Sequence, residues 1–151
     1  MSTPTPVDTA RIEKMLSRRD IHFGSISDSE FAVPTHNAVF HINTSNPQIL
    51  QVRGQWRGVA ADGSSFALLA EQIAQCNATR TGPKAYLAPF EDGEHFGLIA
   101  ESNIVATAGL TPTQLDTFFE SSMSLIMCFF RDLEAACPSL VTWDDNEEVE
   151  P

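Results

Sequence analysis

The long apolar run at residues 115–133 constrains the fold of this chain more than any other feature. It is preceded by Thr111, Pro112 and Gln114. This pattern is typical of a helix start, because threonine and glutamine form a capping box and proline suits the first helical position. Apolar side chains then recur at helical spacing on one broad stripe: Leu115, Phe118, Phe119, Ile126, Phe129, Phe130 and Leu133. The sequence therefore predicts a long amphipathic helix that packs on the core.

Three further side chains of this helix, Met123, Met127 and Cys128, fall beside or outside the apolar stripe. A helix with more apolar surface than one core can cover needs a second contact. That contact could be a second copy of the chain, a client protein or a small apolar ligand. We identify these three residues as a candidate interface.

Length and composition favour one domain in a reducing compartment. The 151 residues are enough to bury a real core. We expect a single domain at residues 7–138, a flexible N-terminus at 1–6 and a disordered acidic tail at 139–151. Three cysteines fit reduced thiols, and the chain starts without a signal peptide and has no apolar run of the roughly 18 residues that a membrane span requires. We therefore expect a cytoplasmic protein.

The charge of the chain bears on its partners. The formal net charge is −11, and five acidic residues lie within 144–150. Such a chain is repelled by phosphate groups, which argues against nucleic acid or an anionic membrane as the main partner. The acidic end is typical of a solvated tail that aids solubility.

Changes of hydrophobic period predict an α+β fold. Helical spacing is expected from about Thr5–Asp8 to Arg19, after Asp62 up to Thr81, and in the final run. Alternation predicts strands near residues 22–26, 30–33, 38–42, 50–57, 84–90 and 95–105. The order α-β-β-β(-β)-α-β-β-α lacks parallel βαβ repetition, so we expect an antiparallel sheet with helices packed on it. Pro89 lacks a backbone donor, which places its strand at an edge, at a bulge or near its own end.

Residue patterns typical of catalysis are missing. The four histidines form no metal-binding pair, the cysteines have no ligand spacing, and glycine-rich phosphate loops and nucleophile elbows are absent. We expect no cofactor, no metal and no enzymatic activity, although a site assembled in space needs no linear motif.

Four polar residues on the predicted sheet form a second candidate, a polar groove. Arg53 and Arg57 share the polar face of the best strand, and Lys84 and Tyr86 share a face of a later one. They could bind an acidic segment or a carboxylate ligand, and a solvated sheet face explains them equally well. Asn77 continues the stripe of the second helix and could tie the helix end to the following loop or cap it.

Several of these segments together resemble the successive signatures of the YbjN family, bacterial proteins described as sensory transduction regulators. The resemblance spans about Asp8 to Cys137. It rests on Leu50-Gln51-Val52-Arg53-Gly54-Gln55-Trp56, Asn77 with Pro83-Lys84-Ala85-Tyr86, Ala100-Glu101, and Leu110-Thr111-Pro112-Thr113-Gln114-Leu115. One departure is Thr81-Gly82, where the family often carries an aromatic residue before Pro-Lys, so a groove formed by that aromatic would be altered.

The resemblance implies a fold similar to class I type III secretion chaperones, often dimeric and without established enzymatic activity. From it and the surplus apolar surface we predict a chaperone-like interaction or regulatory domain in bacterial sensory transduction or stress response, binding a protein client as a homodimer. The alternative is a sensor that holds a small ligand in a cavity between the sheet and the final helix, with Arg53 or Lys84 converging on it.

Overall fold

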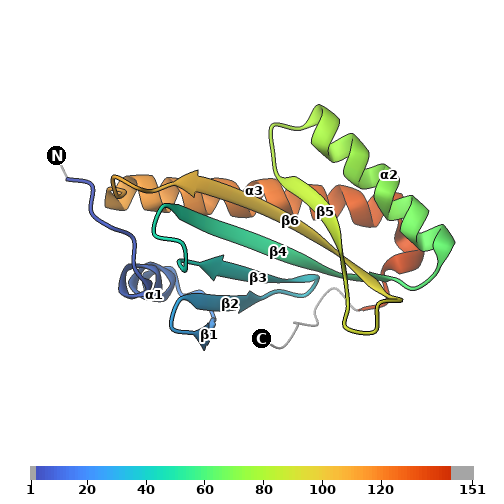
Figure 1. Cartoon of the computed structure of the whole chain (residues 1–151), viewed down its shortest axis with the longest axis horizontal. Coiled ribbons are helices and arrows are strands. Elements are labelled where there is room, and N and C mark those ends of the chain that lie inside the picture. The colour runs from blue at the N-terminus through green and yellow to red at the C-terminus, as the bar shows by residue number, and fades with distance from the viewer. Residues whose placement is uncertain (1–2, 144–151) are drawn as a thin grey trace.

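A six-stranded sheet and three α-helices make up the computed structural model, which describes residues 3–143. Figure 1 shows the arrangement, with the last helix lying behind the sheet. In chain order the elements are α1 (Thr9–Arg18), β1 (Gly24–Ser27), β2 (Glu30–Pro34), β3 (Ala38–Asn43), β4 (Ile49–Ala60), α2 (Gly63–Thr79), β5 (Lys84–Pro89), β6 (Phe96–Val105), α3 (Pro112–Ala136) and the short 3₁₀ helix η1 (Pro138–Leu140).

Every strand pairing in the sheet is antiparallel, in the spatial order β1-β2-β3-β4-β6-β5. β6 therefore inserts between β4 and β5, and β5 lies at one edge. The α+β fold and the order of elements predicted from the sequence are confirmed. The central strand β4 is longer than expected because it starts at Ile49 and continues past a register shift between Gln55 and Val59 up to Ala60.

The helices begin where side chains cap their free N–H groups. The Asp8 carboxylate accepts from the backbone N–H of Arg11 at the start of α1, and Asp62 accepts from Ser65 N–H at 2.8 Å at the start of α2. At α3, Thr111 Oγ1 accepts from Gln114 N–H, and Gln114 Oε1 accepts from Thr111 N–H. The predicted capping box of the last helix is thus present, with Pro112 at its first position.

α3 covers one face of the sheet, and Gly54 in β4 is where the two come closest. Even-numbered residues of β4 from Leu50 to Ala60 are buried on this face. A Cβ atom at Gly54 would lie 3.0 Å from Ile126 and 3.1 Å from Phe130 of α3. The predicted helix stripe faces the same core: Leu115, Phe119, Ile126, Phe129, Phe130 and Leu133 are buried, and Phe118 is half-buried. The space between sheet and helix is filled with side chains.

α2 lies beside the edge strand β5 instead of over the middle of the sheet (Figure 1). The Asn77 side-chain amide donates to the carbonyl of Ala85 and accepts from its N–H, both at 3.0 Å. Asn77 therefore ties the helix to the next strand and occupies part of that strand's outer edge. Pro89 ends β5, in agreement with the expected edge position.

Both ends of the described chain contact the domain. Thr5 exchanges backbone hydrogen bonds with Leu110. After η1, the buried ring of Trp143 packs edge-on against Trp56, with ring centroids 5.6 Å apart. The first residues of the expected tail, 139–143, thus lie against the fold. Residues 1–2 of the expected N-terminus and 144–151 of the expected tail lie outside the described residues.

Substitution Gly54→Ala tests the close approach of α3 to β4. The added methyl group would overlap Phe40, Ile126 and Phe130, and overpacking of this kind costs about 1–3 kcal/mol. We expect the free energy of unfolding to fall by that amount, which urea titration measures as a lower midpoint. Gly63→Ala is the control, because no atom lies within 4 Å of its Cβ position and alanine favours a helix, so its stability should stay equal or rise. Equal midpoints for Gly54→Ala and wild type would contradict this packing.

Candidate functional site

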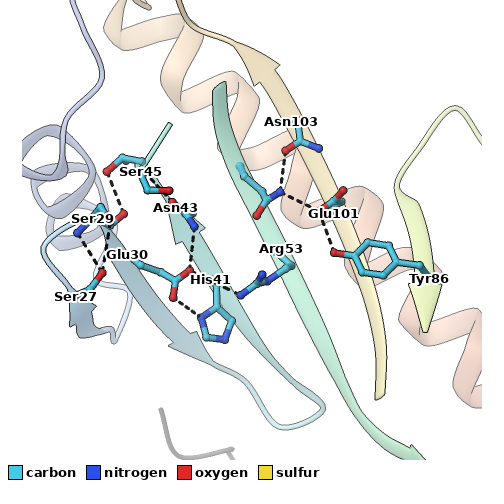
Figure 2. A network of polar contacts seen from close by, with 12 residues as sticks. Ser27, Ser29, Glu30, His41, Asn43, Ser45, Arg53, Tyr86, Glu101 and Asn103 are labelled. Carbon is cyan, nitrogen blue, oxygen red and sulfur yellow. Dashed lines mark hydrogen bonds and ion pairs between the residues drawn. The ribbon is translucent and has the colours of Figure 1, made fainter. Parts of the chain in front are cut away.

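A polar cluster occupies the sheet face that is turned away from α3. Odd-numbered residues of β4 point to this face, and the antiparallel register brings polar residues of four other strands beside them. Figure 2 shows five of these side chains in front of the sheet: Glu30, His41, Arg53, Tyr86 and Glu101. We define the polar cluster as Glu30 from β2, His41 from β3, Gln51 and Arg53 from β4, Lys84 and Tyr86 from β5, and Glu101 from β6.

Glu101 is the centre of one half of the cluster. Its side chain is only 10% exposed. Gln51 Nε2 donates to its Oε2 at 2.9 Å, the Tyr86 hydroxyl donates to the same oxygen at 3.2 Å, and Lys84 Nζ lies 3.7 Å from Oε1. Burial raises the pKa of Tyr86, and the Glu101 carboxylate raises it further because it repels a tyrosinate and holds the phenol proton.

Glu30 is the centre of the other half. The Arg53 guanidinium lies 3.7 Å from its Oε1, and His41 Nδ1 lies 3.6 Å from its Oε2. Burial lowers the pKa of His41, the positive charge of Arg53 lowers it further, and Glu30 opposes both effects. His41 is therefore a neutral imidazole at pH 7, and its Nδ1 is buried without a hydrogen-bond partner.

The structure brings three of the four residues of the predicted polar groove into this cluster. Arg53 stands opposite Glu101 in the β4–β6 register, and Lys84 and Tyr86 both reach Glu101. Arg57 lies apart: its guanidinium donates to the carbonyl of His36 at 3.1 Å and lies over the ring of Trp143. The cluster thus combines two half-buried carboxylates with two cations on a sheet surface.

The acidic members of the cluster escaped the sequence analysis. Glu30 and Glu101 are the groups that hold the predicted cations together, yet each comes from a different strand. Alternation within each strand places them on the polar face, which was the available signal. Their meeting depends on the strand register, which a single sequence does not show.

The candidate interface of α3 lies at a second site. Met127 is 42% exposed and Cys128 is half-buried, and both line an open groove of about 420 Å³ between α3 and the β2–β3 turn. Met123 is half-buried against the core and does not line this groove. The other lining residues are His36, Asn37, Ser124, Arg131 and Glu134. Leu125, which the sequence analysis did not single out, is also exposed on α3.

Glu134 fixes the end of this groove. Its Oε2 accepts a hydrogen bond from Asn37 Nδ2 at 2.7 Å and another from Trp56 Nε1 at 2.9 Å. These bonds join α3 to β4 and to the β2–β3 turn, so the groove has walls held in place by buried polar groups. The shape of the groove is therefore set by contacts within the fold.

The described side chains of the two sites do not provide the donors for a metal. Within residues 3–143, no group of three or more His, Cys, Asp and Glu side chains converges on a point that could hold an ion. Cys76 and Cys137 are buried, and burial raises the pKa of both thiols, so they remain protonated at neutral pH.

Glu101→Gln tests the polar cluster through the single tyrosine of the chain. Removing the carboxylate charge should lower the pKa of Tyr86, although burial still holds it above its ordinary value. Ultraviolet titration of tyrosinate formation measures this directly. Because the native pKa is raised, Tyr86 contributes stability that is present below its unfolded pKa near 10 and lost as pH rises through the native value. The variant should therefore lose less stability in alkali.

Glu30→Gln is the matched control, since Glu30 is not among the groups that shift Tyr86. An unchanged tyrosine titration in Glu101→Gln would contradict the described contact.

None of the helices in residues 3–143 combines the length and the hydrophobicity that a membrane span requires.

The chain has a solved structural neighbour, titled "Crystal structure of YbjN, a putative transcription regulator from E. coli". The two superpose with a TM-score of 0.74 at 18% sequence identity, over 91% of this chain and 98% of that chain. At this identity the likeness shows the fold. A search of the curated proteins finds no match.

The family model named YbjN, described as "Putative bacterial sensory transduction regulator", matches residues 8–135. The match covers most of the chain, and its limits agree with the segment in which the family signatures were recognised. The resemblance expected from the sequence is confirmed, and the protein belongs to the YbjN family.

Proposed function

We propose that this protein is a cytoplasmic, non-enzymatic regulatory domain that works as a homodimer and binds a protein client. The observation that carries the proposal is the groove beside Met127, where this apolar side chain of α3 is 42% exposed although the apolar stripe of the helix is largely buried. The family description as a regulator supports a role in binding over one in catalysis.

The composition of the groove supports pairing between two copies of the chain. It contains a cation, Arg131, and an anion, Glu134, one turn apart beside the flexible apolar side chain of Met127. A two-fold interface places the same patch on both partners, so a patch with both charges can match its own copy. Methionine adapts its shape to the opposing surface.

The alternative, a small-ligand sensor with a cavity between sheet and α3, is less well supported. Arg53 and Lys84, which would recognise the ligand, lie on the face turned away from α3. The side toward α3 is occupied by Phe40, Ile126 and Phe130. The cations that would recognise the ligand and the expected cavity therefore lie on opposite faces of the sheet.

The charge of the chain supports a protein as the regulated partner. The neighbour from E. coli is titled a transcription regulator, but a net charge of −11 opposes direct binding to a phosphate backbone. We propose that any effect on transcription or signalling passes through a bound protein, and that nucleic acid and membranes are not the direct partners.

Met127→Glu tests the homodimer. A carboxylate in the centre of the proposed interface would be desolvated without a partner, so we expect the dimer dissociation constant to rise about tenfold or more. Sedimentation equilibrium of the full chain at micromolar concentration measures it. Met127 is exposed, so the fold of each protomer should hardly change.

Leu68→Glu is the control, because Leu68 is 40% exposed on α2 and lies outside the groove. It introduces the same charge at an equally exposed apolar position and should leave the association unchanged. A wild-type chain that stays monomeric at these concentrations, or equal behaviour of both variants, would rule out this interface.

A further inference from the structure

The two parts of the β5–β6 sheet edge differ in how they are protected. Free strand edges attract other chains, and proteins usually block them. β5 is blocked at Ala85, whose N–H and carbonyl both bond to Asn77, and at Pro89, which has no N–H. These two positions leave little of β5 available for pairing.

β6 continues past Lys84, the first residue of β5, as Figure 1 shows. β5 pairs with β6 from Pro89 opposite Phe96 to Lys84 opposite Glu101, and β6 extends to Val105. Within the described residues, the segment 102–105 of β6 thus has β4 on one side and no strand on the other.

The register identifies the backbone groups on this free side. Ala85 directs its N–H and carbonyl to Asn77, away from β6, so the neighbouring positions Lys84 and Tyr86 direct theirs toward β6. Glu101, which pairs with Lys84, therefore directs its backbone groups toward β5. Two and four residues further on, Asn103 and Val105 face the same side, while Ile104 faces β4.

An apolar groove accompanies this free edge. It measures about 370 Å³ and lies between the end of β6 and the first half of α3. Ile104 and the half-buried ring of Phe118 line it, with Thr113, Gln114, Thr117 and Ser121 along the helix. At 73%, Val105 is the most exposed large apolar side chain of the described chain. Among residues 3–143, no charged side chain lines the groove.

We propose that the free edge of β6 at residues 102–105 binds an extended peptide segment of a partner protein by strand addition. Backbone groups of the segment pair with Asn103 and Val105, and one bulky apolar side chain enters the groove beside Phe118. This inference rests on the proposed function, because it specifies how the client is held. It places the client at a different surface from the groove of Met127.

The size of the site favours a short peptide over a second copy of the chain. A stable dimer buries about 800 Å² and some 20–30 residues on each partner. Here the groove is lined by six residues and the free edge spans four. Backbone pairing at two residues with one buried side chain suits a linear segment, and the uncharged lining suits one that is apolar and uncharged at the contact.

A phage-displayed library of random linear peptides, selected against the full chain, provides the probe. We expect selected peptides to show alternating apolar residues and to bind with micromolar affinity in fluorescence anisotropy. Val105→Pro removes one outward N–H without removing a bond to β4, and should weaken binding about tenfold or more. Val105→Thr, the matched control, keeps the N–H and the strand preference, and should bind nearly as the wild type does.

Peptides that bind Val105→Pro and Phe118→Ala as tightly as the wild type would overturn strand addition, and so would a selection that yields no peptide. Should Val105→Pro fail to fold, N-methylation of the peptide at its pairing residues gives the same test: loss of binding supports the proposal, and retained binding overturns it. Peptides that depend on Met127 instead would refute this site and leave the proposed function standing. A monomeric chain that selects no peptide would count against both.

Discussion

The packing of α3 on β4 at Gly54 is the contact on which the other features of this structure depend. The missing side chain lets Ile126 and Phe130 approach the sheet, and Phe40 of the neighbouring strand closes the same space. Polar contacts hold α3 in this position at both ends. Arg18 at the end of α1 and the following Arg19 pair with Asp116 near the start of α3, and Glu134 near its end accepts a hydrogen bond from Trp56. The helix thereby buries one face of the sheet along its length.

Because one long helix covers one face, the opposite face is free to be polar. The carboxylates Glu30 and Glu101 are partly removed from water there, and they are tolerated since each has a cation and a hydrogen-bond donor beside it. The same arrangement determines where partners can bind. One groove, beside Met127, lies between α3 and the β2–β3 turn, and the other lies between α3 and the free end of β6. Both proposed binding surfaces lie at these grooves.

Local chemistry made most of the fold predictable. The caps of α2 and α3, the alternation of β4 and the edge position of Pro89 all depend on neighbours within a few residues. For Asn77 the sequence left two roles open, a tie to the following loop or a helix cap, and its amide bonds Ala85 of the next strand. Arg53 and Arg57 were grouped by their shared face, but β4 shifts register after Gln55 and Arg57 turns to His36 and Trp143.

The sequence by itself determined the order of elements, the capped helix starts, the apolar stripe of α3 and, through its signatures, the family. Those features depend on periodicity and on contacts between near neighbours in the chain. Only the tertiary structure decided that Glu101 contacts Tyr86, Lys84 and Gln51. It also decided that Met123 lies apart from the groove of Met127 and that β6 extends past the residues that pair with β5. Each of these depends on strand register and helix placement, which are set by the packing of distant segments against one another.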